Sequence, residues 1–363
     1  MTDRRLAEQV RIVGSGLLGT SIGLGLSAKG VDVILDDVSP SSKQLAIDYG
    51  AGRAPAAGDN PGLIVVAVPP DVTASVVARE LAAFPDALVT DVASVKLGPL
   101  RQLRDVGADL SRYLGTHPMA GRERGGPIAA RADLFIGRPW VLAGHDAISY
   151  RRAAAIEDMI LDLGAVPIEM GVEDHDRSVA LVSHVPQVVS SLLAARLTDG
   201  SHAALGLAGG GVRDVTRIAA SEPSLWVQIL GANAGPVARI LKALRDDLDT
   251  VIDALDEPDA SGSRRRIAEA IAAGNTGVAR LPGKHGQDAR FSQLVIMVDD
   301  RPGELARLLT DIGDAGVNME DLRLEHSPGA QIGLAEVSVV PEAEQRLLEE
   351  LERRGWRIAE AWT

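Results

Sequence analysis

Short apolar runs alternate with helical patterns along the first part of the chain. Runs rich in β-branched residues predict strands at Val10–Val13, Val31–Leu35, Leu63–Val68, Leu88–Val89, Tyr113–His117, Pro139–Ala143 and Val166–Glu169. Segments with helical spacing lie between them, at Leu17–Ala28, Ser41–Tyr49, Val72–Ala82 and Tyr150–Leu163. Near-continuous apolar strands, each followed by a helix, are typical of a parallel sheet covered on both faces. Residues 1–171 are therefore predicted to form one α/β domain.

The strand pattern ends after Gly171, and residues 172–256 are predicted to form an all-helical domain. Four segments are helical in composition: Asp174–Leu197, Ser201–Ala219, Pro223–Leu230 and Ala234–Leu255. The first three are apolar on nearly all sides, which is typical of buried helices. Because so apolar a domain commonly buries its surplus surface against a second copy of itself, we expect a homodimer.

The remainder of the chain divides into a linker, residues 257–290, and a compact unit, residues 291–363. In the linker, Asn275–Gly277 and Leu281–Gly286 are expected to be irregular and Arg264–Ala273 to be a short surface helix. The compact unit shows predicted strands at Gln293–Val298, Val317–Arg323, Ala330–Val340 and Trp356–Ala361, with helices at Glu304–Ala315 and Glu342–Arg353. This βαββαβ order is that of a ferredoxin-like fold, which would dock a partner, a ligand or a second copy of itself.

Composition narrows the choice of partners and compartment. The 363 residues favour two or three domains, and the net charge of -13 without a basic patch argues against nucleic acid. Cysteine is absent, which excludes disulfides and cysteine-ligated metal. The amino-terminal segment lacks the apolar core of a signal peptide, and no run approaches the ~20 apolar residues that span a bilayer. We expect a soluble cytoplasmic protein with no metal site and no membrane contact.

A glycine-rich turn, Gly14-Ser15-Gly16-Leu17-Leu18-Gly19, follows the first predicted strand and opens the first predicted helix. In this context Gly14 permits the tight turn, Gly16 lets the backbone approach a pyrophosphate, and Gly19 allows the helix to pack closely on the strand. The helix amino terminus supplies unpaired N–H groups to the phosphates. The pattern predicts a Rossmann-like dinucleotide-binding domain, and a tight turn without a ligand is the alternative.

The second predicted strand ends at Asp36 and Asp37. An acidic group there accepts the ribose 2′-hydroxyl and repels a 2′-phosphate, so Asp36 favours NAD over NADP. Nearby Lys43 and several serines could soften that preference. Val68 and Pro69 end the third strand and should pass beside the adenine-side ribose and phosphates, although a turn that only ends the strand is equally compatible.

Two histidines stand where chemistry is plausible. His117 ends a predicted strand, and ligands of open α/β sheets gather beyond the carboxyl ends of strands. It faces the nicotinamide crevice or belongs to an ordinary turn. His184 lies within an apolar helical segment, shares a face with Asp176, and precedes Pro186, which should kink the helix. A buried structural histidine is the alternative there.

Three further groups could contact a substrate. Ser94 follows the fourth strand, where it could bind a hydroxyl or cap the next helix. Arg217 and Asp214 follow the glycine turn 209–211, and an arginine in an apolar domain suits bidentate capture of a carboxylate. The alternative is an Arg–Asp pair that joins helices. Gly121 closes the segment that begins at His117.

Taken together, these motifs resemble the prephenate and arogenate dehydrogenase family of tyrosine biosynthesis. The resemblance spans about Val10 to Leu248 and rests on five motifs in order: Gly14–Gly19, Asp91–Lys96, His117–Gly121, His175–His184 and Arg213–Ala219. The tail resembles an ACT domain, a ferredoxin-like module that often binds amino acids, on the basis of Asp300–Gly303 and Gly316–Asn318.

The resemblance implies an NAD-dependent oxidative decarboxylation of prephenate to 4-hydroxyphenylpyruvate, with arogenate to tyrosine as the alternative. It implies that His117 accepts the proton of the ring hydroxyl, that Ser94 orients this hydroxyl, and that Arg217 holds a carboxylate. His184, Asp214 and Gly121 would shape the substrate's surroundings. The ACT-like tail implies feedback by tyrosine or another aromatic amino acid at an interface between two such modules.

Two departures from the family pattern affect the substrate site. Val185 and Gln187 stand where members often read Leu and a second His, and Arg122 and Glu123 stand where a Thr is common after Gly121. They bear on contacts to the side chain that distinguishes prephenate from arogenate.

Two other hypotheses of function compete with a prephenate or arogenate dehydrogenase. A hydroxyacid dehydrogenase or imine reductase would share the sheet-plus-helices plan but usually needs a helix-borne lysine near the nicotinamide, for which Lys96 is the one candidate. A catalytically silent NAD-binding amino-acid sensor is the other, and it would have no need of His117, Ser94 or Arg217.

Overall fold

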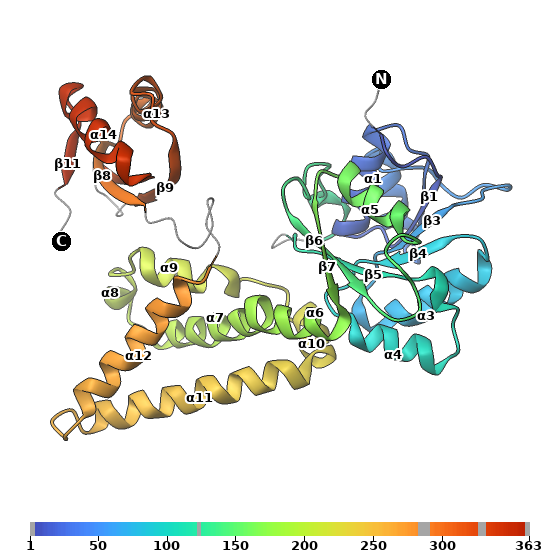
Figure 1. The fold of residues 1–363 in the computed structure, drawn as a ribbon, viewed down its shortest axis with the longest axis horizontal. Coiled ribbons are helices and arrows are strands. Elements are labelled where there is room, and N and C mark those ends of the chain that lie inside the picture. Colours follow the sequence, from blue (N-terminus) through green and yellow to red (C-terminus); the bar gives the residue numbers. More distant parts are fainter. Residues whose placement is uncertain (1–3, 122–124, 282–290, 326–331, 360–363) are drawn as a thin grey trace. The chain divides into compact units, whose positions relative to one another are not determined.

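The computed structural model describes residues 4–121, 125–281, 291–325 and 332–359 (Figure 1). The chain separates into two compact units. The first comprises Met1–Gly200 and Val215–Leu244, and the second comprises Ser201–Asp214 and Arg245–Thr363.

The first unit begins with a four-stranded parallel sheet in the order β2-β1-β3-β4. Its strands are β1 (Val10–Val13), β2 (Val33–Asp36), β3 (Leu63–Val66) and β4 (Leu88–Asp91). The helices that accompany it are α1 (Leu17–Ala28), α2 (Pro40–Asp48), α3 (Pro70–Ala83) and α4 (Leu97–Asp105). Apolar strand residues are buried on both faces of the sheet, in two separate clusters that also contain helix side chains. The predicted strand–helix alternation is confirmed here, including the helix expected after Ser94.

A second sheet contains β5 (Gly115–Pro118), β6 (Pro139–Gly144) and β7 (Val166–Gly171), with α5 (Ala154–Asp162) between the last two. A parallel bridge between Val89 and Tyr113 joins the segment before β5 to β4. β5 and β6 pair antiparallel, so the expectation of a wholly parallel sheet is wrong. The described chain between them contains only the short 3₁₀ turn Pro127–Ala129. The strands of a parallel pair are usually joined by an α-helical crossover.

The helical part of the chain is more divided than the sequence pattern predicts. Its elements are α6 (Val172–Val179), a π-helix (Ala180–His184), α7 (Val185–Arg196), α8 (His202–Leu205), α9 (Gly210–Thr216), α10 (Pro223–Ala232), α11 (Ala234–Asp256) and α12 (Ser263–Val278). The single helix expected at 201–219 is interrupted, because glycines at 206 and 209 weaken it. Pro186 lies in the first turn of α7, where a missing N–H costs little, and the π-helix directly precedes it.

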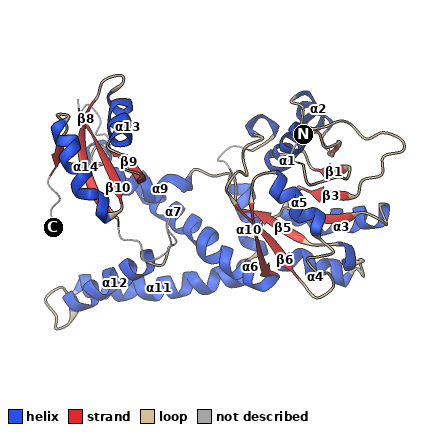
Figure 2. Cartoon of the chain, turned by 45° about the horizontal axis from the view of Figure 1, so that its top comes forward, coloured by secondary structure: helices blue, strands red, loops and turns tan. Residues whose placement is uncertain are grey.

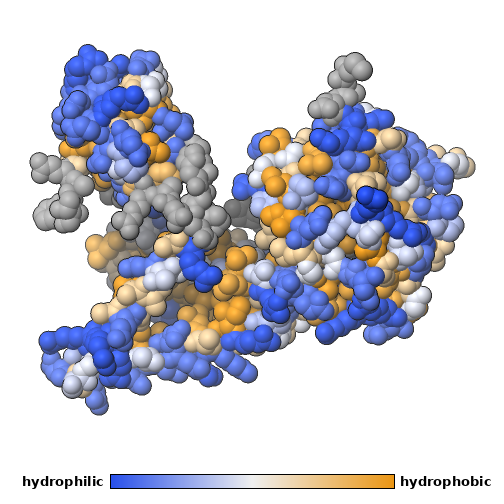
Figure 3. Space-filling view, in the orientation of Figure 1, coloured by the Kyte–Doolittle hydropathy of each residue, from blue (hydrophilic) through white to orange (hydrophobic). Residues whose placement is uncertain are grey.

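The helices expected to be buried are largely exposed in the single chain. The segment Val172–Asp199 is long and apolar enough to cross a membrane, so the expectation that no run reaches that length is wrong. Only 33% of its most apolar window is buried. Its exposed apolar side chains include Leu181, Val182, Leu192, Leu193 and Leu197. Figure 3 shows hydrophobic side chains at the surface of the helical region.

The linker is also more ordered than expected. Helix α12 continues to Val278, so Asn275–Gly277 is helical rather than irregular. The backbone amide of Ala279 donates to the carbonyl of Asn275 at 3.0 Å, which is the pattern of an α-helix. Most of the predicted irregular segment Leu281–Gly286 lies outside the described residues.

The carboxyl-terminal module has the predicted βαββαβ order (Figure 2). It comprises β8 (Ser292–Asp299), α13 (Glu304–Asp314), β9 (Met319–Glu325), β10 (Ile332–Val339), α14 (Pro341–Arg353) and β11 (Arg357–Ala359). The sheet is antiparallel in the order β11-β8-β10-β9, and both helices contribute to its core through Leu308 and Leu347. The ends of two predicted strands, at 330–331 and 360–361, lie outside the described residues.

Candidate active site

The glycine turn is shaped by close backbone contacts. Gly14 has a φ of 104°, and a Cβ atom there would lie 2.3 Å from the carbonyl oxygen of Ala67. A Cβ atom on Gly19 would lie 1.9 Å from the carbonyl oxygen of Gly14. Neither position can carry a side chain without displacing backbone, so both glycines are required by the fold itself.

Gly16 differs from the other two glycines because a Cβ atom there would meet no atom within 4 Å. Helix α1 begins directly after it, with no side chain capping its amino terminus and no acidic residue in its first turn. The first-turn amides, beginning with those of Leu17 and Leu18, therefore stay available to an anion. Open space above Gly16 and an uncapped helix end fit the diphosphate of a dinucleotide.

Two acidic side chains lie beside this turn, at the end of β2. Asp36 pairs with Arg11 at 2.7 Å and with Lys43 at 3.3 Å. Burial opposes its ionisation, but hydrogen bonds from these two cations outweigh burial and lower the pKa of Asp36. Asp37 contacts the turn directly, since its Oδ2 accepts the Ser15 amide at 2.6 Å and the Ser15 hydroxyl at 2.8 Å. Ser15 is therefore held by the protein itself.

Val68 and Pro69 follow β3 and border the glycine turn. A Cβ atom on Gly14 would lie 3.2 Å from Cγ1 of Val68. Pro69 is exposed and caps α3 without a side-chain hydrogen bond. This position suits contact with a nucleotide and also suits a turn that only ends the strand.

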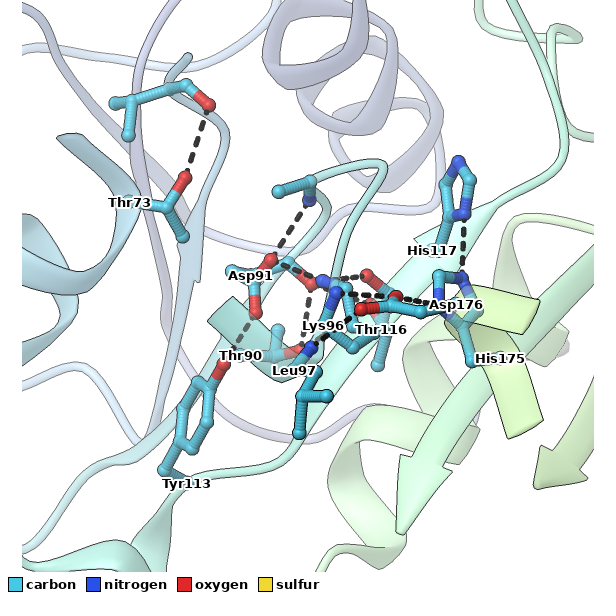
Figure 4. Close-up of polar contacts among 12 residues, drawn as sticks. Thr73, Thr90, Asp91, Lys96, Leu97, Tyr113, Thr116, His117, His175 and Asp176 are labelled. Atoms are coloured by element: carbon cyan, nitrogen blue, oxygen red, sulfur yellow. Dashed lines mark hydrogen bonds and ion pairs between the residues drawn. The ribbon is translucent and has the colours of Figure 1, made fainter. Parts of the chain in front are cut away.

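His117 lies on β5 and belongs to a chain of hydrogen bonds (Figure 4). Its Nδ1 lies 2.9 Å from Nε2 of His175, and Nδ1 of His175 lies 2.8 Å from Oδ1 of Asp176. His175 and Asp176 are both on α6, and all three side chains are buried. The chain thus joins a sheet residue to a carboxylate on the first helix of the helical region.

The start of helix α4 anchors the carboxylate of Asp176. Its Oδ1 accepts the backbone amide of Lys96 at 2.9 Å, and its Oδ2 accepts that of Leu97 at 3.0 Å. Burial raises the pKa of Asp176, but the hydrogen bonds from His175 and these two amides more than compensate, so its pKa lies below the ordinary value. Asp176 is therefore ionised near neutral pH.

An ionised carboxylate only accepts hydrogen bonds, and this fixes the direction of the chain. In its neutral form His175 donates from Nδ1 to Asp176, and its Nε2 then accepts from Nδ1 of His117. The Nε2 atom of His117 is then an unprotonated acceptor, and it has no partner among the described residues. Burial, followed by repulsion from His175, Lys96 and His184, lowers the pKa of His117 well below its ordinary value. His117 is thus a neutral base with an available lone pair.

Lys96 is engaged elsewhere. Its ammonium group is buried between Asp91 and the carbonyl of Thr116, to which it donates at 2.6 Å. The second carboxylate oxygen of Asp91 accepts the hydroxyl of Tyr113 at 2.7 Å. These contacts occupy the one lysine that could support a hydroxyacid dehydrogenase or imine reductase mechanism.

His184 ends the π-helix and is 1% exposed. Its Nδ1 lies 3.1 Å from Nδ2 of Asn233, and its ring meets that of Trp226 edge to face with centroids 6.1 Å apart. Burial lowers the pKa of His184 to about 4. Gln187 is buried and donates to the hydroxyl of Ser191.

The remaining predicted site residues are less constrained. Ser94 is half-buried just before α4, and its hydroxyl makes no hydrogen bond within the described part of the chain. Arg217 and Asp214 are exposed. Gly121 follows β5, whereas Arg122 and Glu123 lie outside the described residues.

Sequence reasoning missed two residues of this site, His175 and Asn233. His175 was visible in the His-Asp pair near the start of the predicted helix Asp174–Leu197, but its contact with His117 spans 58 positions. Asn233 stands between two predicted helices and gave no signal. Within the described residues, no group of three or more His, Asp or Glu side chains could hold a metal ion.

Comparison with known proteins identifies the family. The model of the prephenate dehydrogenase nucleotide-binding domain matches residues 22–169, and that of the prephenate dehydrogenase dimerization domain matches residues 171–269. The chain is 39% identical over 356 residues to a probable prephenate dehydrogenase of Streptomyces niveus, covering 95% of this chain and 98% of that relative. The chain belongs to the prephenate dehydrogenase family.

Solved structures support the fold. A prephenate dehydrogenase of Aquifex aeolicus, solved with hydroxyphenyl propionate and NAD⁺, superposes with a TM-score of 0.65 at 24% identity, covering 76% of this chain and all of that one. A Synechocystis arogenate dehydrogenase gives a TM-score of 0.61 at 24% identity, covering 74% and 99%. Prephenate dehydrogenases are NAD-dependent oxidoreductases, so the dehydrogenase class expected from the sequence is confirmed by the family. The family match therefore speaks against the hypothesis of a catalytically silent NAD-binding sensor.

Proposed function

We propose that this chain oxidises prephenate with NAD and releases 4-hydroxyphenylpyruvate and CO₂. The observation that carries the proposal is the chain of hydrogen bonds from Asp176 through His175 to His117, in a protein of the prephenate dehydrogenase family. It supplies a neutral imidazole whose Nε2 is free to accept a proton. Arogenate, with an amino acid in place of the keto acid side chain, is the alternative substrate.

His117 acts on the ring hydroxyl in this mechanism. Its Nε2 accepts the hydroxyl proton as the carbinol carbon loses a hydride, and bound NAD supplies the hydride acceptor. The ring carboxylate then leaves as CO₂, and its bonding electrons make the ring aromatic. The phenolate oxygen takes the proton back from His117, so atoms and charges balance without another base. Ser94 lies where it could orient the hydroxyl through its own unpaired oxygen.

Substrate binding is assigned to residues of the helical region. Arg217 is an exposed cation with no ion pair among the described residues, so its guanidinium can receive a carboxylate in bidentate geometry. His184 is a buried neutral imidazole. Asp214 and Gly121 remain predicted contributors to the substrate's surroundings.

Cofactor binding is assigned to Gly14, Ser15, Gly16, Leu17, Leu18 and Gly19, with Asp36, Val68 and Pro69 beside them. The structure adds Asp37 as a second acidic candidate, because it contacts the glycine turn while Asp36 is paired with two cations. Either carboxylate would repel the 2′-phosphate of NADP. We infer a preference for NAD on that ground.

We also propose that the protein is a cytoplasmic homodimer. The exposed side chains of the π-helix and α7, Leu181, Val182, Leu192 and Leu193, lie in the region that matches the family's dimerization domain, and a second copy would cover them.

The carboxyl-terminal module is proposed to be an ACT domain that binds tyrosine or another aromatic amino acid. A pocket of about 200 Å³ lies beside the turn that contains Asp300 and Arg301, where Leu305, Leu324 and Leu334 supply apolar lining. An apolar wall beside charged groups suits an amino acid. Tyrosine should therefore inhibit the full-length enzyme, and truncation before residue 291 should abolish this inhibition while activity is kept.

The test of the proposed function incubates purified protein with prephenate or arogenate, each with NAD or NADP, and follows the reduced cofactor. Prephenate with NAD should give the highest kcat/KM. Faster turnover of arogenate would identify arogenate as the substrate. No reduction of the cofactor with any of the four pairs would refute the dehydrogenase function.

A further inference from the structure

We propose that Asn233 is a positioning residue that holds His184 as a hydrogen-bond donor to a substrate oxygen. The inference rests on the proposed function only for the identity of the substrate. The orientation of the Asn233 amide and the tautomer of His184 follow from contacts within the protein. It adds a role for a residue between α10 and α11 that no catalytic motif includes.

The orientation of the Asn233 amide follows from its two contacts. Nδ2 lies 2.7 Å from the backbone carbonyl oxygen of Asp176 and 3.1 Å from Nδ1 of His184. A carbonyl oxygen only accepts, so the amide atom that faces it must be the NH₂ group rather than the oxygen. That same NH₂ group then donates its second hydrogen to Nδ1 of His184. Asn233 is 2% exposed, so water does not compete for these contacts.

This contact fixes the tautomer of His184. An Nδ1 atom that accepts a hydrogen bond carries no proton, so a neutral His184 must carry its proton on Nε2. Burial keeps the ring neutral, because it lowers the pKa of His184 to about 4. Nε2 of His184 has no hydrogen-bond partner within the described chain. It therefore remains a donor for a ligand oxygen.

The two neutral histidines consequently carry opposite functions. His117 donates from Nδ1 to His175 and presents Nε2 as an acceptor, whereas His184 accepts at Nδ1 and presents Nε2–H as a donor. Both tautomers depend on the same residue, because Asp176 uses its side chain for the first and its backbone carbonyl for the second. A substrate with a hydroxyl group and a carboxylate or carbonyl oxygen matches this pair. The hydroxyl donates to His117, and the oxygen accepts from His184.

The first experiment determines the tautomers in the wild-type protein. Histidine labelled with ¹⁵N gives ring-nitrogen shifts that distinguish protonated from unprotonated nitrogen, and His184→Gln assigns the His184 signals by their loss. At pH 7 we expect Nδ1 of His184 to be unprotonated and Nε2 to be protonated. The opposite pattern, or a charged ring, would overturn the proposal. This readout needs neither substrate nor cofactor.

The second experiment changes Asn233 to Leu, which keeps the volume but removes the NH₂ group. We expect KM for prephenate to increase about tenfold, as for loss of one buried hydrogen bond, with kcat changed by less than about threefold. Asn275→Leu, on the exposed surface of α12, is the matched control and should leave both constants unchanged. A folded Asn233→Leu protein with the wild-type KM and tautomer would overturn the proposal. If none of the substrates were turned over, the proposed function would fail, and the tautomer measurement would still decide the role of Asn233.

Discussion

The imidazoles of His117 and His175 meet edge to face, with Nδ1 of the first 2.9 Å from Nε2 of the second. Asp176 accepts from the other nitrogen of His175 and is itself held by two amides at the start of α4. His175 is therefore the element through which a fixed carboxylate sets the proton position on His117.

Replacing His175 by Leu should lower kcat about 100-fold and change KM little, because His117 would lose the partner that holds its productive tautomer. The acid limb of the pH profile should also move to higher pH, since repulsion from His175 contributes to the low pKa of His117. Steady-state kinetics across pH measures both effects. His202→Leu, at an exposed position, is the control. A variant with lower kcat but an unshifted acid limb would leave His175 with a packing role only.

The pH dependence of kcat/KM in the wild-type enzyme follows from the state of His117. Only the neutral imidazole can accept the hydroxyl proton, and burial lowers its pKa well below 6.5. Lowering the pH from 7 should therefore leave kcat/KM nearly constant through pH 6.5, and activity should fall only at more acidic pH. Circular dichroism at each pH separates this loss from unfolding. An acid limb centred at or above 6.5 would show that His117 is not the titrating base.

The glycine turn predicts different results for two substitutions of the same kind. Gly19→Ala should unfold or strongly destabilise the protein, because the new methyl group would lie 1.9 Å from a backbone oxygen. Gly16→Ala should keep the fold, since its methyl group meets no protein atom, yet raise KM for NAD about tenfold or more by entering the diphosphate space. Thermal melting and NAD titration distinguish the two. Wild-type NAD binding by Gly16→Ala would place the diphosphate elsewhere.

The two acids at the end of β2 can be separated by Asp36→Asn and Asp37→Asn. Asp37 touches the glycine turn, so its amide variant should show the larger loss of preference for NAD over NADP. Asp36→Asn should chiefly weaken the pairing with Arg11 and Lys43, which melting experiments detect. The ratio of kcat/KM values for the two cofactors is the measurement. A larger change in Asp36→Asn would restore the assignment of the ribose to Asp36.

Arg217→Ala should raise KM for prephenate by at least about tenfold while leaving KM for NAD unchanged, because a carboxylate would lose its charged partner. Arg213→Ala is a matched control, because Arg213 is also exposed and lies four residues earlier. Equal effects of the two variants would indicate a general electrostatic attraction rather than a specific contact.

The dinucleotide domain was predictable because its signals are local. The run from Val10 through Gly19 combines strand, turn and helix signals within ten residues, and Gly14 and Gly19 have the close contacts that such a turn requires. His117 was found for a similar reason, since its place at a strand end follows from the pattern of apolar runs.

The rest depended on contacts between distant segments. Nothing local shows that His175 meets His117 across 58 positions or that Asn233 meets the carbonyl of Asp176 across 57. The antiparallel direction of β6 was missed because an apolar strand has the same pattern in either direction. Helix burial was overestimated because apolar composition does not reveal whether the covering surface belongs to the same chain.

The π-helix Ala180–His184 gives this region a constraint on length. Each residue of an α-helix turns the chain by about 100°, and a π-helix arises when one extra residue is accommodated. α6 presents His175 and Asp176 on one side of this insertion, and α7 presents Leu192 and Leu193 on the other. Because the wider turn absorbs the extra residue, deleting one residue from Ala180–His184 would restore a regular helix with little rotation of these two sets relative to each other. The length of this segment therefore sets the backbone at His184, because the deletion would replace the π-helical turn that ends there with an α-helical one.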